Sequence, residues 1–158
     1  MPLPGGTAPP HPLRTARAPL SARPSLPAAE LLIQARKALG EAANHSGPAD
    51  RYAMAHLAAL RAAAAVLASR AQPAGSPLRR RPTSAWVLLT SIVPELGEWA
   101  AFFAAGARKR AAAEAGSPQA VTSREADDLI RDVWTFVAVV EDILRLPAAL
   151  LEATARPG

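Results

Sequence analysis

Two side chains in the segment RYAMAH, Arg51 and His56, are of types that can do acid–base chemistry on a bound anion. A guanidinium donates paired hydrogen bonds to phosphate or carboxylate oxygens, and an imidazole takes up and releases protons near neutral pH. The segment has helical periodicity, and five positions along a helix rise about 7.5 Å and turn through about 500°, so the two side chains project about 140° apart. They meet at one substrate only if the helix bends, if the long arginine reaches across, or if a second subunit supplies one of them.

The alternative is that both residues serve the fold. His56 shares a helix face with Tyr52 and Leu60, so the periodicity directs its ring toward the apolar side of the helix. In this interpretation His56 is a core histidine with a backbone or side-chain partner, and Arg51 is solvated beside Asp50.

Other charged groups could also bind ligands. Arg79, Arg80 and Arg81 lie in a proline-flanked loop and could contact nucleic-acid phosphates, whereas the three cations at 108–110 fit a solvated helix face better. Acidic residues gather at 125–132, at the start of the last expected helix, where the helix macrodipole favours negative charge. A metal site is the less favoured interpretation of this acidic group. The sequence also has no phosphate-binding glycine loop and no nucleophile motif, so we expect neither metal nor cofactor.

The composition favours one soluble domain. The chain has 158 residues, half of them apolar, and no cysteine, which excludes disulfides and fits a cytoplasmic protein. The longest apolar stretch contains Glu95 and Glu98, so we expect no membrane span.

Residues 1–24 are rich in proline and arginine and carry part of the net charge of +5. They lack the apolar stretch of a secretory signal, so we expect a disordered tail followed by a helical domain over residues 25–158.

Four segments have the periodicity of amphipathic helices, and no segment of usable length alternates as a strand does. The expected helices cover residues 26–44, 48–71, 83–116 and 122–146. Pro94 should kink or split the third, because it lacks a backbone donor and crowds the preceding turn. Thr122 and Glu125 have the spacing of a capping box. The sequence thus predicts an all-α fold, an up-and-down bundle of four main helices whose outward alanine-rich faces could form a homodimer.

The expected core consists of apolar residues at helical spacing and of large aromatics. In the first helix these positions are Leu31, Ala35, Ala38, Leu39 and Ala42. In the last helix they are Leu129, Val133, Phe136, Val137, Val140 and Leu144. The aromatic residues expected in the core are Trp86, Trp99, Phe102, Phe103 and Trp134.

Three stretches together resemble a known group of proteins: RYAMAHLAALRAAAAVLASR, SAWVLLTSIVPELGEWAAFFAAGARKRAAAEAG and VTSREADDLIRDVWTFVAVVEDIL. Over residues 26–146 the chain is similar to a small actinobacterial family of the HEPN superfamily, compact helical domains associated with nucleotide binding and RNA cleavage. The resemblance implies that Arg51 would hold the scissile phosphate and His56 would move protons in a metal-independent reaction, at an interface between two subunits. Tyr52 follows the arginine, where ribonuclease members usually have a polar residue.

Three hypotheses follow. The favoured one is a non-catalytic or regulatory HEPN module, a homodimer that binds a nucleotide, RNA or a protein partner. The second is a metal-independent endoribonuclease that uses Arg51 and His56 from two subunits. The third is a DNA-associated protein that uses the basic tail and the loop Arg79–Arg81.

Overall fold

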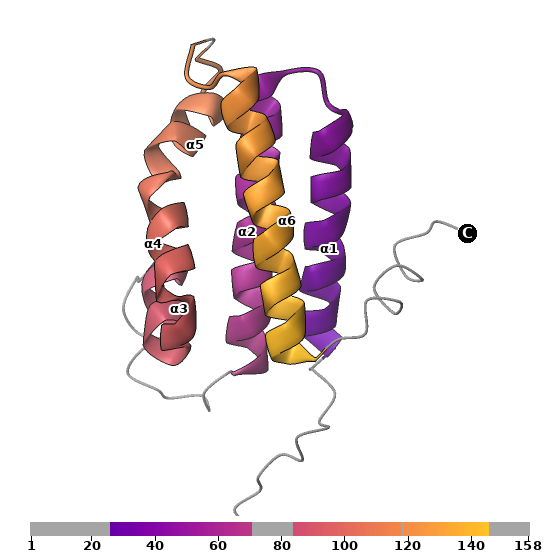
Figure 1. Ribbon diagram of the computed structural model, residues 1–158, viewed down its shortest axis with the longest axis vertical. Coiled ribbons are helices and arrows are strands. Elements are labelled where there is room, and N and C mark those ends of the chain that lie inside the picture. The colour runs from indigo at the N-terminus through magenta and orange to yellow at the C-terminus, as the bar shows by residue number, and fades with distance from the viewer. Residues whose placement is uncertain (1–25, 71–83, 118, 146–158) are drawn as a thin grey trace, which may run out of the picture.

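The computed structural model describes residues 26–70, 84–117 and 119–145, and the chain is all-α within these ranges (Figure 1). Three long helices are α1 (Leu26–Asn44), α2 (Pro48–Ser69) and α6 (Ser123–Leu144). The third segment forms α3 (Ala85–Ile92), the short 3-10 helix η2 (Pro94–Leu96), α4 (Gly97–Ala105) and α5 (Ala107–Glu114). In Figure 1, α4 and α5 continue one another along the side of the bundle, and α3 packs against α4. The predicted bundle of four main segments is confirmed, while the expected tail lies outside the described residues.

Local chemistry sets two helix starts. At α6 the Thr122 hydroxyl oxygen accepts from the Glu125 backbone N–H at 3.1 Å, and Glu125 Oε2 accepts from the Thr122 N–H at 2.8 Å. This reciprocal pair is the predicted capping box. Ser84 starts α3 in a similar way, because its hydroxyl accepts from the Val87 N–H at 3.3 Å.

The third segment is interrupted twice. Pro94 separates α3 from α4, as predicted, through a 3-10 turn. A second break falls at Gly106, which divides the expected long helix into α4 and α5. This break was not predicted, because one glycine within a helical pattern is usually tolerated.

The core lies where α2 packs against α1, α6 and the third segment. All six predicted core positions of α6 are buried. In α1 four of the five predicted positions are buried, but the predicted Leu31 is only half-buried, and Leu32, one position later, is buried in its place. Two of the aromatics expected inside are exposed, Phe102 by 47% and Trp134 by 36%. Trp134 instead lies beneath the Arg36 guanidinium, 5.4 Å from its ring centroid, where a cation stabilises a half-exposed ring.

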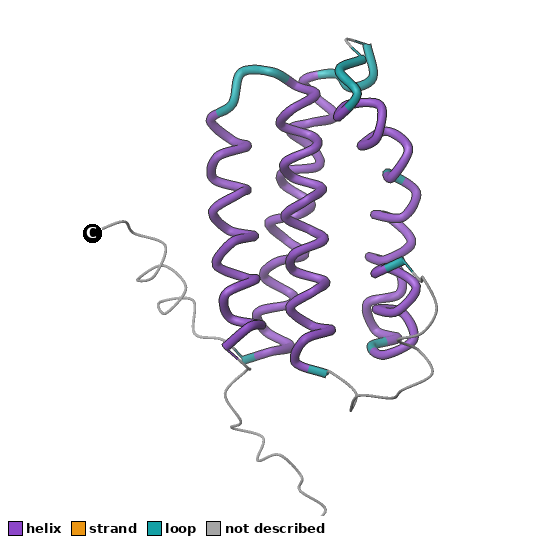
Figure 2. The backbone as a smooth tube through the Cα atoms, turned by 180° about the vertical axis from the view of Figure 1, so that it is seen from behind, coloured by secondary structure: helices purple, strands orange, loops and turns teal. Residues whose placement is uncertain are grey.

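Seen from behind, α2 runs in front of α6, between α1 and the α4–α5 column (Figure 2). By length and composition α2 could cross a membrane, and it alone among the described helices meets this test. Half of its most apolar window is buried inside the bundle, as is typical of the central helix of a helical domain.

Candidate functional site

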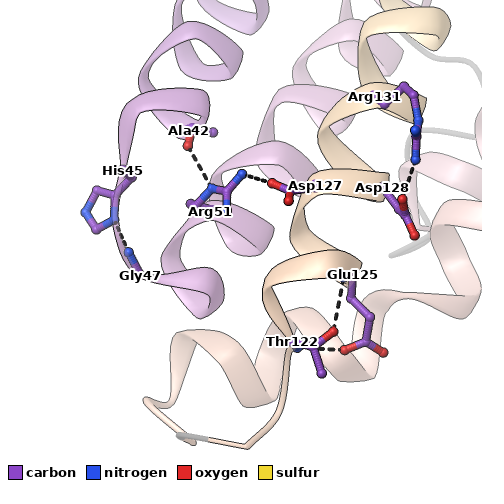
Figure 3. Close-up of polar contacts among 9 residues, drawn as sticks. All are labelled: Ala42, His45, Gly47, Arg51, Thr122, Glu125, Asp127, Asp128 and Arg131. Atoms are coloured by element: carbon purple, nitrogen blue, oxygen red, sulfur yellow. Dashed lines mark hydrogen bonds and ion pairs between the residues drawn. The ribbon is translucent and has the colours of Figure 1, made fainter.

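The guanidinium of Arg51 is held between α1 and α6 (Figure 3). Its Nε donates to the carbonyl oxygen of Ala42 at 3.3 Å, and its Nη2 pairs with Asp127 Oδ1. Only 15% of the Arg51 side chain is exposed, against 59% for Asp127. This differs from the interpretation in which Arg51 is solvated beside Asp50. Asp50 instead lies 3.8 Å from Nε2 of His45.

His56 is buried in the core, with 1% of its surface exposed. Its Nε2 lies 3.0 Å from the carbonyl oxygen of Phe103 in α4. Since a carbonyl can only accept, Nε2 carries the proton and Nδ1 has a lone pair. Among the residues that the structure describes, none hydrogen-bonds to this Nδ1. The ring meets Trp86 and Phe103 edge to face, with centroids 6.1 Å away in both cases, so it packs as an aromatic core residue.

Burial also determines the charge of His56. Loss of hydration lowers the pKa of the His56 imidazole below its usual value, and the nearby Arg110 lowers it further. The Phe103 carbonyl and Glu114 act in the opposite direction without reversing the shift. The ring is therefore neutral at pH 7, as a core histidine should be.

The side chains of Arg51 and His56 point from α2 toward different helices. Arg51 contacts α1 and α6, whereas His56 contacts α4, which agrees with the divergence of about 140° expected from helix geometry. A phosphate at Arg51 would have to displace Asp127, and His56 is engaged elsewhere, with its Nε2 on the Phe103 carbonyl. Within one chain the two candidate catalytic residues are not brought together.

A pocket of about 270 Å³ lies beside His56, where α2, α4, α5 and α6 meet. Its lining residues are Tyr52, His56, Phe102, Phe103, Ala105, Gly106, Lys109 and Leu129. Gly106 leaves space here, because a Cβ at this position would lie 3.0 Å from the Tyr52 hydroxyl oxygen, a tight contact, and 3.6 Å from His56 Cδ2. Its φ of −80° is accessible to any residue, so the close approach of Tyr52 is what favours glycine.

Lys109 supplies a cation to this pocket. Its ammonium pairs with Oε1 of Glu125, the carboxylate whose Oε2 completes the capping box of α6. This hydrogen bond raises the pKa of Lys109 and lowers that of Glu125, so both groups are charged at neutral pH. Burial raises the pKa of Tyr52, although Lys109 partly opposes the shift, and the phenol therefore keeps its proton for donation.

The acidic residues at the start of α6 form separate ion pairs. Besides the pairs of Asp127 and Glu125, Asp128 pairs with Arg131 one turn later (Figure 3). In the described part of the chain no three histidine, aspartate or glutamate side chains come together as a possible metal site.

The candidate nucleic-acid residues Arg79, Arg80 and Arg81 lie outside the described residues. The pocket was not predicted from the sequence. The one sequence feature that could have indicated it was Gly106, a glycine within a helical segment. Lys109 was expected on a solvated face, but it lines the pocket.

The fold and the site define a compact all-α domain built around a central helix with a buried histidine. The family model described as SAV_6107-like HEPN matches residues 42–141, from the end of α1 through most of α6. The chain therefore belongs to the HEPN family, which confirms the resemblance found in the sequence. No curated protein and no solved structure matches the chain.

Proposed function

We propose that this HEPN domain is a non-catalytic module that acts by binding a nucleotide, RNA or a protein partner. The observation that carries the proposal is that Arg51 and His56 are each engaged within the chain. Arg51 pairs with Asp127, and His56 donates to the Phe103 carbonyl from a buried position. A ribonuclease needs an arginine free to grip phosphate and an imidazole that reaches the reacting oxygen. Neither condition holds in the single chain.

A homodimer belongs to the same proposal. The solvent-facing side of α2 carries Ala53, Leu57 and Ala64, and Leu57 is 40% exposed. Small and apolar side chains on a helix face allow a second helix to pack closely. We place the domain at residues 25–158 and the protein in the cytoplasm. The ribonuclease alternative needs a dimer that frees both side chains, and the DNA-binding alternative depends on arginines outside the described residues.

The decisive experiment incubates the protein in excess over mixed cellular RNA in the presence of EDTA. Wild type, Arg51→Met and His56→Gln are compared, with His45→Gln as a matched control because His45 is an exposed histidine. We expect intact RNA in all four samples. Cleavage by the wild type and the control, abolished by both Arg51→Met and His56→Gln, would establish the ribonuclease instead.

A binding assay on the same proteins separates the ligand classes. Fluorescence anisotropy with a labelled RNA and with a labelled nucleotide, at low and at high salt, measures how much of any affinity comes from phosphate contacts, because such contacts weaken steeply with salt. A steep dependence that persists without residues 1–24 would point to the helical domain rather than to the basic tail.

A further inference from the structure

The pocket beside His56 contains a tyrosine hydroxyl for which the described part of the chain supplies no hydrogen-bond partner. Tyr52 is the only tyrosine of the chain and is 7% exposed. Its hydroxyl oxygen lies over Gly106, yet no described residue hydrogen-bonds to it. A phenylalanine would fill the same space, so packing alone does not require the hydroxyl. The hydroxyl therefore faces a position where a ligand atom could accept its proton.

A cation lines the same pocket. An ammonium group has three donors, and Lys109 uses one of them on Glu125 Oε1. The other two have no partner among the described residues, and Lys109 lines the pocket, so an acceptor bound there is within its reach. α5 carries three consecutive cations and one acid, in the sequence ARKRAAAE, and Glu125 of α6 pairs with Lys109. Three cations against these two acids leave one net positive charge at this end of the pocket, which favours an anion.

Apart from the imidazole of His56, the remaining side chains of the wall are apolar. Phe102, Phe103, Ala105 and Leu129 contribute carbon surface, and Phe102 is 47% exposed. The volume of about 270 Å³ is slightly below the range of about 300–1,000 Å³ typical of drug-sized ligands. The space suits a ligand of one ring, with an apolar body and one anionic end.

We propose that this pocket binds a small single-ring carboxylic acid, whose carboxylate accepts from the Tyr52 hydroxyl and from Lys109 and whose ring packs against Phe102 and Leu129. The inference deepens the proposed function, because it gives a module that acts by binding a ligand of defined chemistry. Glu125 and the ligand share Lys109, so the ligand would sit next to the capping box that starts α6.

Fluorine-19 NMR tests the site directly. Protein grown with 3-fluorotyrosine gives one signal, because the chain has one tyrosine. The probe is benzoate, and the controls are acetate, which lacks the ring, and toluene, which lacks the carboxylate. We expect benzoate to shift the signal saturably and to bind at least about tenfold more tightly than either control, since each control lacks one of the two interactions.

Single-residue variants test which side chains bind benzoate. Lys109→Met should weaken benzoate binding by about tenfold, because a charge-assisted hydrogen bond is lost. The control is Lys37→Met, which removes the only other lysine of the chain, an exposed one on α1, and should leave benzoate binding unchanged. Unlabelled Tyr52→Phe, followed by calorimetry, should lose a similar factor. Absence of a saturable shift with benzoate, equal binding of toluene, or equal losses in the two lysine variants would overturn the proposal. The RNA assay above is independent: cleavage would overturn the non-catalytic function without affecting the pocket.

Discussion

Replacing His56 by alanine should cost the domain a large part of its stability. The ring is 1% exposed and packs edge to face against both Trp86 and Phe103, so its removal leaves a cavity in the aromatic part of the core. Truncation of a large buried side chain to alanine costs about 2–5 kcal/mol. The Phe103 carbonyl also loses its 3.0 Å partner, and a buried acceptor without a hydrogen bond costs about 1–3 kcal/mol. Because the two effects overlap, we expect a total of about 3–4 kcal/mol.

Urea and thermal unfolding measure this loss. For a domain of roughly 100 residues, 1 kcal/mol corresponds to about 4–8 °C in Tm, so His56→Ala should melt at least about 12 °C below the wild type. The matched control is His45→Ala. His45 is exposed and accepts only a 3.2 Å hydrogen bond from the Gly47 N–H, so we expect a loss below about 1 kcal/mol. If both variants lose less than about 1 kcal/mol, His56 does not hold the core together and the reasoning fails.

Three further predictions follow from the structure. The pKa of His56 is lowered in the fold, so on acidification the unfolded chain takes up the proton first. The free energy of unfolding should therefore fall as the pH drops below about 6.5, as measured by urea titrations near pH 5.5 and pH 7.5. His56→Gln, which has an amide donor but does not titrate, should lack this decrease. A double-mutant cycle with Arg51→Met and Asp127→Asn should give a coupling of about 0.5–1 kcal/mol, since Asp127 is 59% exposed; a coupling near zero would mean that the pair does not hold Arg51. Gly40→Ala should raise stability by about 1 kcal/mol, since nothing lies within 4 Å of the new methyl group in α1. Gly106→Ala should lower stability by about 1–3 kcal/mol, because the new methyl group crowds the Tyr52 hydroxyl. Equal effects of the two substitutions in thermal melts would contradict the close approach of Tyr52 to Gly106.

The features predicted correctly depend on short-range chemistry. The capping box needs only Thr122 and Glu125, three residues apart, and the break at Pro94 follows from the missing backbone donor. The inward direction of His56 follows from the position of the ring on one amphipathic helix. Each of these can be deduced without knowing what lies across the bundle.

The features that were missed depend on contacts between distant segments. Arg51 was assigned to solvent because its partner Asp127 lies 76 residues away in sequence. The error of one position at Leu31 arose because both Leu31 and Leu32 fit an apolar stripe, and only packing against α2 selects Leu32. Phe102 was assigned to the core on hydrophobicity, although folded proteins also expose much apolar surface.

The pocket could not be predicted for the same reason. Four helices contribute its walls, and the residues that give it chemistry, Tyr52 and Lys109, are 57 positions apart in the numbering of the chain. Gly106 was the local sign of a close approach. Only the fold shows that the Tyr52 hydroxyl occupies the space that the glycine leaves.

The central claim is that His56 belongs to the fold and takes no part in proton transfer to RNA. A nitrogen-15 correlation spectrum of the histidine ring nitrogens at neutral pH, with and without RNA, tests it most directly. We predict a protonated, slowly exchanging Nε2 and an unprotonated Nδ1 for His56, unchanged by excess RNA, because the ring is buried and donates to Phe103. A His56 that titrates near pH 6.5, or whose nitrogens shift when RNA is added, would contradict the account.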